Sequence, residues 1–366
     1  MKLVSIVLLS VGLAHGQARP EQKPLMAEQI FKNIQVLKGI PASQFMATMG
    51  FFSASLGMNC TDCHGIESAG NWDKYADETD KKRTARRMVV MMSAINKSYF
   101  GGRRMVTCYS CHRGGERPRV TPSLAELYGP PPVEEPDEIR QQAPNAPSAD
   151  QILDRYIEVL GGAQRLASLT SLVAKGTYQG YADTEKRPIE IFAKAPAQRT
   201  TIVHALGGDI TTTYDGRSAW TSAPSTDSPV PLLELTGGDL EGVKLDVELT
   251  FPARIKQALA QWRVGFPANV DDREVRIAQG TSDGRYPVNL YFDSKSGLLV
   301  RLVRYTDSPV GLAPTQIDYS DYREVAGIKM PFRWTVTWLD GRSTTELSEI
   351  QPNVPIDGAK FAIPVR

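Results

Sequence analysis

Histidine and cysteine are scarce in this chain, which has only four of each among its 366 residues. Long apolar runs are missing as well, because no segment after the N-terminus offers the roughly 20 apolar residues that a membrane-spanning helix needs. A strong net charge is also absent: the formal charge is +1, and no nucleic-acid-binding motif, phosphate loop or catalytic triad pattern occurs. These absences argue against a nucleic-acid-binding protein and against an integral membrane protein.

The N-terminus has the pattern of a secretory signal peptide. A charged start at Lys2 leads into an apolar stretch, residues 3–14, which is too short to span a bilayer. Small residues follow at Gly16 and Ala18, where cleavage is expected. We therefore assign residues 1–18 to a signal peptide and expect an exported, periplasmic protein, free or peripheral to the membrane, with no transmembrane segment in the mature chain.

Composition divides the mature chain into three parts. Residues 19–120 contain all four cysteines and eight of the ten methionines, and helices are expected over residues 44–56 and from Asp80 onward. Residues 121–149 contain seven prolines with acidic residues between them, which predicts an extended linker. Residues 150–366 alternate apolar and polar side chains and predict an antiparallel β domain. The fold class is thus an all-α N-terminal domain followed by an antiparallel β half-barrel with a few helices.

Within the β domain, the clearest strand is residues 332–338, where large apolar residues alternate with polar ones before a turn at Asp340-Gly341. One helix is expected to begin at the cap Asp150. A second is expected over residues 252–262, after the cap Thr250. We predict a single, strongly twisted antiparallel sheet wrapped partly around a helix.

The four cysteines occur in two copies of the pattern C-x-x-C-H, at residues 60–64 and 108–112. This pattern is typical of covalent haem c attachment: the two thiols bond to the two vinyl groups of the porphyrin, and the adjacent histidine reaches the iron. The predicted attachment residues are Cys60, Cys63, Cys108 and Cys111, and the predicted iron ligands are His64 and His112. The sequence therefore predicts two covalently bound haem c groups. Two alternatives are a zinc site with four thiolate ligands and redox-active disulfides.

The small number of histidines limits which residues can serve as the sixth ligand of each iron. Besides the two motif histidines, the chain has only His15, in the signal peptide, and His204, in a strand-like segment. Two haems that each have two histidine ligands are therefore impossible, and methionine is the natural alternative, since a thioether opposite histidine raises the reduction potential. The candidate methionines are Met46, Met49, Met88, Met91 and Met92. Their periodicity also suits methionines of a hydrophobic core, so spacing alone does not choose among them.

Residues 26–120 resemble one half of the cytochrome subunit of bacterial photosynthetic reaction centres. The matching segments are Val36-Leu37 and Phe45-x-x-x-Met49 before the first motif, Ala85-Arg86-Arg87-Met88 and Ile95-Asn96 before the second, and Val106 to Gly114 around it. In that family a helix carrying the axial methionine precedes each C-x-x-C-H motif. The resemblance thus implies that Met49 is the sixth ligand of the first haem and Met88 that of the second.

The chain also departs from that family. It has motifs for two haems where the family's subunit carries four, it has no cysteine before Cys60 to which a lipid anchor could attach, and it carries a large β domain. A respiratory or other periplasmic electron-transfer chain is therefore an alternative to a photosynthetic one. The β domain looks similar to the half-open barrels of lipoprotein carriers and sorting proteins. That resemblance implies a lipid or a protein as its ligand.

Charge is distributed unevenly around the second motif. Residues 81–119 contain eleven basic residues and one acidic residue, Glu116, whereas residues 120–160 contain eight acidic and two basic residues. The basic segment suits haem propionates or redox partner proteins, and a solvated helix face is the alternative. We hypothesise that the acidic linker lies across the basic segment.

The sequence leaves three functions to compare. The leading one is a periplasmic electron carrier with two His/Met-ligated haems and protein redox partners. The second is a di-haem peroxidase-like enzyme with one open iron site, although the N-terminal domain shows no acid/base cluster for it. The third is a lipid- or protein-binding β domain that carries a redox module.

Overall fold

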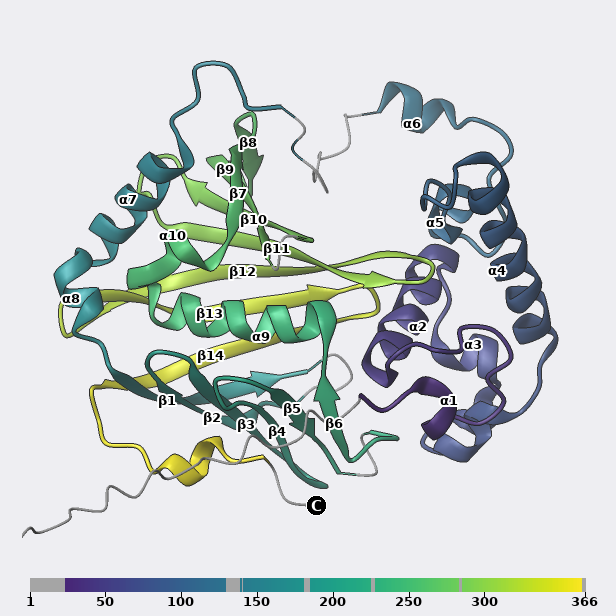
Figure 1. Ribbon diagram of the computed structural model, residues 1–366, viewed down its shortest axis with the longest axis horizontal. Coiled ribbons are helices and arrows are strands. Elements are labelled where there is room, and N and C mark those ends of the chain that lie inside the picture. Colours follow the sequence, from purple (N-terminus) through teal and green to yellow (C-terminus); the bar gives the residue numbers. More distant parts are fainter. Residues whose placement is uncertain are drawn as a thin grey trace, which may run out of the picture.

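The computed structural model describes residues 24–129, 139, 141–180, 185–224, 228–282 and 285–363. The predicted signal peptide and the middle of the predicted linker, including Pro130 to Pro132, lie outside these residues. The chain forms a helical domain, drawn in purple and blue in Figure 1, beside a large curved sheet drawn in green and yellow. The predicted fold class, an all-α part followed by an antiparallel β part, is confirmed.

The helical domain contains short helices around two long ones. Its elements are α1 (Ala27–Ile30), α2 (Ala42–Leu56), α3 (Cys60–His64), η1 (Ile66–Ser68), η2 (Trp72–Ala76), α4 (Asp80–Tyr99), α5 (Cys108–His112) and α6 (Leu124–Tyr128). Helix α4 starts where the Thr79 hydroxyl accepts a hydrogen bond from Lys82 N, 3.2 Å away, and it stops before Gly101 and Gly102, which both adopt positive φ. Both predicted long helices are confirmed.

The described strands of the C-terminal domain form one 14-stranded antiparallel sheet in the order β6-β5-β4-β3-β2-β1-β14-β13-β12-β11-β10-β9-β7, with β8 paired to β9. The strands are β1 (Ser171–Gln179), β2 (Arg187–Lys194), β3 (Gln198–Ala205), β4 (Gly208–Tyr214), β5 (Ala219–Ser222), β6 (Leu232–Leu235), β7 (Ala260–Val264), β8 (Ala268–Val270), β9 (Arg273–Ser282), β10 (Tyr286–Asp293), β11 (Leu299–Ser308), β12 (Gly311–Val325), β13 (Ile328–Trp338) and β14 (Gly341–Pro352). The helices of this domain are α7 (Ala149–Leu160), α8 (Ala163–Ala167), α9 (Gly237–Thr250), η3 (Pro252–Arg254), α10 (Ile255–Ala258) and η4 (Gly358–Phe361).

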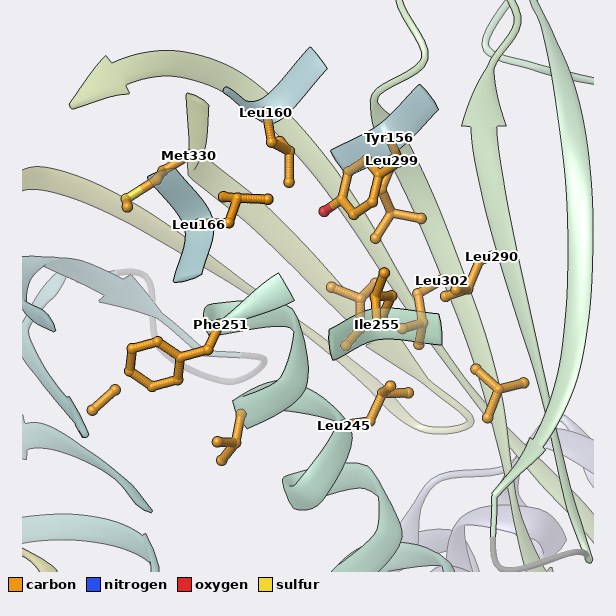
Figure 2. Close-up of a cluster of buried hydrophobic side chains, with 14 of the residues drawn as sticks. Tyr156, Leu160, Leu166, Leu245, Phe251, Ile255, Leu290, Leu299, Leu302 and Met330 are labelled. Atoms are coloured by element: carbon orange, nitrogen blue, oxygen red, sulfur yellow. The ribbon is translucent and has the colours of Figure 1, made fainter. Parts of the chain in front are cut away.

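The sheet curves around α9, which crosses its concave face in Figure 1. Figure 2 shows how side chains from α7, α8, α9 and α10 meet the sheet in the main core. The labelled residues are Tyr156, Leu160, Leu166, Leu245, Phe251, Ile255, Leu290, Leu299, Leu302 and Met330. Ile255, Leu290 and Leu302 have no exposed surface, so the sheet and the helices share one apolar interior. The predicted single sheet around a helix is confirmed.

The helices of the β domain were predicted less well than its strands. The helix expected over residues 252–262 begins at Pro252, as η3, but it ends at Ala258 with α10; Thr250 is the last residue of α9 and not the cap, and Trp262 lies on β7. The helix inside the sheet is α9, which sequence periodicity did not reveal. Helix α7 begins one residue before the expected Asp150, because Ser148 forms the cap and its hydroxyl accepts a hydrogen bond from Gln151 N at 3.2 Å.

Two glycines bring the segments around the C-x-x-C-H motifs together. Gly57, which ends α2 with φ +62°, lies so close to Gly114 that a Cβ atom would be 2.3 Å from the Gly114 carbonyl oxygen. Gly114 N in turn donates a hydrogen bond to Ser55 O at 2.9 Å. The turn before the first motif is thus packed on the end of the second.

Gly57→Ala should therefore lower the unfolding free energy of the helical domain much more than Gly101→Ala. Both glycines have φ near +60°, but a Cβ at Gly101 meets no atom within 4 Å. The control should cost about 1 kcal/mol, from backbone strain alone. Gly57→Ala should cost roughly 3 kcal/mol or more, because the added methyl also clashes with backbone. If urea unfolding showed the same loss of unfolding free energy in both variants, the close contact between Gly57 and Gly114 would be contradicted.

Candidate functional site

Both C-x-x-C-H motifs form short helices that begin at a reciprocal cap. In α3, the Asn59 side chain accepts a hydrogen bond from Asp62 N at 3.0 Å, and the Asp62 carboxylate accepts one from Asn59 N at 2.8 Å. In α5, Thr107 and Ser110 exchange the same pair of bonds, at 3.3 and 3.0 Å. The residues between the cysteines therefore hold each motif in one helical turn, with both thiols and the histidine on that turn.

The two motif histidines are held in the same way. His64 Nδ1 lies 3.0 Å from Tyr75 O, and His112 Nδ1 lies 3.1 Å from Gly115 O. A carbonyl oxygen only accepts, so Nδ1 carries the proton and Nε2 keeps its lone pair in each ring. Metal-ligating histidines commonly have this arrangement, because the hydrogen bond at one nitrogen orients the other toward the metal. Both histidines thus fit the role of a haem iron ligand.

The four cysteines form no disulfide with one another. Burial is the main reason that the pKa of the Cys60, Cys63 and Cys108 thiols is raised, to about 11 for Cys108, and the charge of Asp340 adds to the effect at Cys60. Redox-active C-x-x-C pairs instead have a lowered thiol pKa, because the thiolate is the reactive form. The raised pKa of these three thiols therefore argues against the redox-disulfide alternative.

The zinc alternative requires the four cysteines to converge on one point. Within the part of the chain that the structure describes, no three side chains of histidine, cysteine, aspartate or glutamate are grouped closely enough to hold a metal ion. The four cysteines therefore do not converge on one point among the described residues, and the structure gives no support to a four-thiolate zinc site.

The candidate methionines differ in burial. Met92 is 5% exposed and packs in a small core with Phe51, Val89 and Val310, which assigns it to packing. Met46 and Met91 are exposed, at 41% and 48%. Met49, on α2, and Met88, on α4, are partly buried. A partly buried position on a helix before each motif suits an axial ligand, so Met49 and Met88 remain the best candidates.

Exposed apolar side chains gather in the segments that contain the two motifs. In the first, Met46 and Ile66 are 41% and 72% exposed. In the second, Val90, Met105 and Tyr109 are 55–59% exposed. Large apolar side chains that are exposed in the same segments as two pairs of thiols are expected where an apolar group covers them. A porphyrin attached to each thiol pair would provide that cover, so the residues present fit two haem c groups.

One buried side chain connects α4 to the second motif. Asn96 Nδ2 donates to Val106 O at 2.7 Å, and Asn96 Oδ1 accepts from Met105 N and Val106 N at 3.0 and 2.9 Å. The side chain is 6% exposed. It therefore fixes the segment that leads into α5 relative to the helix that carries Met88.

His204 lies on β3, away from both motifs. Its Nδ1 lies 2.8 Å from Asp209 Oδ1 and its Nε2 lies 3.6 Å from Glu190 Oε2, at the surface of the sheet. It is a partly exposed residue of the sheet, paired with carboxylates.

The ion pairs test part of the linker hypothesis. Glu126 pairs with Arg119, as the hypothesis requires. Asp150 and Asp154, which follow the linker on α7, instead pair with Lys256 of α10, at 3.5 and 2.6 Å, so these two carboxylates bind within the β domain and do not lie across the basic segment. Residues 130–138, with most of the linker's carboxylates, lie outside the described residues.

A second candidate site is a cavity of about 360 Å³ between α9 and the concave face of the sheet. Its lining is mostly apolar, with Ile191, Val243 and Trp334 among its walls. Arg199 Nε and Thr201 Oγ1 also line it, and each is buried without a hydrogen-bond partner. The volume and the lining are those of a small-molecule site. The sequence did not reveal these lining residues, because strand alternation marks the concave face without showing whether it is filled.

Two comparisons of sequence concern the helical part. Residues 12–149 match the family described as photosynthetic reaction centre cytochrome C subunit. The subunit of that name from Thermochromatium tepidum is 33% identical over 97 residues, which are 25% of this chain and 23% of the relative. The one from Roseobacter denitrificans is 32% identical over 107 residues, 27% of this chain and 28% of the relative. The chain thus spans about a quarter of the length of these relatives, and the resemblance drawn from its motifs is confirmed for the N-terminal part.

Solved structures resemble the C-terminal part. A LolA superfamily protein from Nitrosomonas europaea has a TM-score of 0.42 and 14% identity, covering 59% of this chain and 98% of its own. A putative outer membrane lipoprotein-sorting protein domain from Vibrio parahaemolyticus has a TM-score of 0.40 and 9% identity, covering 57% of this chain and 97% of its own. No helix among the described residues is long and apolar enough to cross a membrane.

Proposed function

We propose that this chain is a periplasmic di-haem c-type cytochrome that transfers electrons between protein partners. The observation that carries the proposal is the pair of capped C-x-x-C-H helices, each with a histidine whose Nδ1–H is bound to a backbone carbonyl. The match of residues 12–149 to cytochrome c subunits supports it.

Each proposed haem is held by four residues of this chain. Cys60 and Cys63 attach the first and Cys108 and Cys111 the second, while His64 with Met49, and His112 with Met88, bind the two irons. When bound, each iron supplies a one-electron acceptor and donor, and methionine opposite histidine raises its reduction potential. The chain contributes the orientation of the histidines, the apolar surroundings and the placement of the methionine helices.

Electron transfer is favoured over peroxidase chemistry because a partly buried methionine is available to close each iron site. The test is to add cyanide or hydrogen peroxide to the purified ferric protein and record its absorption spectrum. An electron carrier should keep its spectrum, including the weak far-red band of methionine-bound ferric haem. A high-spin spectrum that changes at once on adding peroxide would support the enzyme instead.

Basic side chains near the second motif suit the docking of an acidic redox partner. Arg87, Lys97, Arg103, Arg113 and Arg117 are exposed. Complementary charge of this kind mainly raises the rate at which two proteins associate, and it makes that rate depend on the salt concentration. We propose periplasmic or membrane-associated redox proteins as the partners.

The cavity of the β domain favours a second, additional function, the binding of an elongated apolar molecule such as a lipid. Its test uses the apolar fluorophore N-phenylnaphthylamine as a probe. The wild-type protein should enhance the fluorescence of the probe, and Val243→Trp, which fills the cavity, should abolish the enhancement. If the wild-type protein left the fluorescence of the probe unchanged, the proposal of lipid binding would be wrong.

A further inference from the structure

The turn between β11 and β12 is inserted into the helical domain. Val310, at its tip, has no exposed surface and packs with Phe51 of α2 and with Val89 and Met92 of α4. A Cβ atom at the next residue, Gly311, would lie 2.1 Å from the Phe51 ring. The β domain therefore supplies part of the hydrophobic core of the helical domain. Figure 1 shows this hairpin, residues 308–311, reaching α2.

Polar contacts hold the hairpin in place. The Arg104 guanidinium binds the Asp307 carboxylate and donates to the Ser308 carbonyl. Gln44 Nε2, on α2, donates to Asp307 O at 3.0 Å. The turn is itself braced, because Ser308 Oγ, which is buried, donates to Gly311 O at 2.7 Å. The tip thus enters the helical domain in one fixed conformation.

A second hairpin of the sheet contacts the same helix. The Asp340 carboxylate, between β13 and β14, lies 3.3 Å from where a Cβ of Gly50 would be, and Leu339 packs on the core that contains Val310. Gly50 follows Met49 directly. Two hairpin tips of the β domain therefore lie against the helix that precedes the first motif.

The small core around Val310 lies between the two helices that carry the proposed axial methionines. Phe51 stands two residues after Met49, and Val89 stands next to Met88. Val310 comes from the β domain and packs against side chains of both helices. The distance between α2 and α4 therefore depends on the volume of the Val310 side chain. Cys108, the first residue of the second motif, is partly buried against the same core.

We propose that Val310 is a positioning residue for both haem irons, through which the β domain fixes α2 and α4 so that Met49 and Met88 reach the metal. This inference rests on the proposed function. An iron–thioether bond is weak and forms only if the sulfur is placed within about 0.5 Å of its bonding position, so a small shift of either helix releases it. The β domain is then a structural part of the redox site, in addition to any ligand it binds.

The test compares Val310→Ala with Val303→Ala in the full-length haem-loaded protein. Val303 lies on the same hairpin, on β11, and is 1% exposed, but it packs in a different core, inside the β domain. Val310→Ala should weaken the far-red methionine band by more than half and raise the rate of cyanide binding by about tenfold or more, because the cavity it leaves lets the helices shift. Val303→Ala should change neither, and Val310→Ile should retain the band.

A second pair of variants addresses the hairpin's anchor without touching the core. Arg104→Gln removes the guanidinium that binds Asp307, whereas Arg103→Gln changes an exposed neighbour. Only Arg104→Gln should raise the rate of cyanide binding. The inference is overturned if the wild-type protein shows the methionine band and both Val310→Ala and Arg104→Gln leave it intact. A wild-type protein without that band would instead overturn the proposed ligation.

Discussion

Replacing Cys60 and Cys63 with alanine should leave a protein that carries one covalent haem per chain instead of two. The two thiols lie on one turn of α3, and no other cysteine is available within 40 residues along the chain to replace them. A porphyrin without thioether bonds is extracted by acid and solvent, so the first haem would be lost on denaturation. The measurement is the intact mass of the denatured protein, together with its haem content in alkaline pyridine.

The reciprocal variant, with alanine at Cys108 and Cys111, is the matched control and should also retain one haem. Each variant should lose the spectrum of one site and keep that of the other, because α3 and α5 are capped separately. Loss of both haems in either variant would mean that the two sites do not form independently. Retention of both would contradict the assignment of the thiols.

Met88→His should lower the reduction potential of one haem by on the order of 0.1 V or more, because the axial ligand is the main determinant of haem potential and histidine favours the ferric state relative to methionine. The other haem should keep its potential. The measurement is a redox titration followed at the haem absorption bands, which separates the two sites as two one-electron steps.

Met91→His provides the control for that titration. Met91 is three residues further along α4 and 48% exposed, so its replacement should leave both potentials near their wild-type values. A shift in Met91→His together with no shift in Met88→His would reassign the ligand to Met91. Met49→His should have the corresponding effect on the first haem, with the exposed Met46 as its neighbour control.

The features that the sequence predicted well are encoded locally. The two motifs and the start of α4 at Asp80 each depend on residues a few positions apart, and the structure has helices at these places. The strand Ile328–Trp338 was likewise visible, because large apolar and polar residues alternate along residues 332–338. Local patterns therefore sufficed for the candidate attachment residues and for the fold class.

Features that depend on distant contacts were missed. Helix α9 is enclosed by the sheet and has apolar residues on several sides, so it lacks the one-sided periodicity of a surface helix. Trp262 continues the spacing of the expected helix, yet it joins the sheet on β7. The burial of Val310 could not be predicted either, since a valine in a two-residue turn ordinarily lies at the surface, and here another domain covers it.

The sequence also left the choice among five methionines open, and burial narrows it. Met92 is excluded as a ligand because it packs in the hydrophobic core. Met49 and Met88 are the candidates that are partly buried on the two long helices. The family resemblance had pointed to the same two residues, so burial and resemblance agree.

The measurement that tests the central claim most directly is the haem content of the purified wild-type protein, determined in alkaline pyridine and compared with the protein concentration. Two haems per chain that stay with the denatured polypeptide are the predicted result. One haem, or none, with the thiols of Cys60, Cys63, Cys108 and Cys111 free to react with an alkylating reagent, would contradict the account.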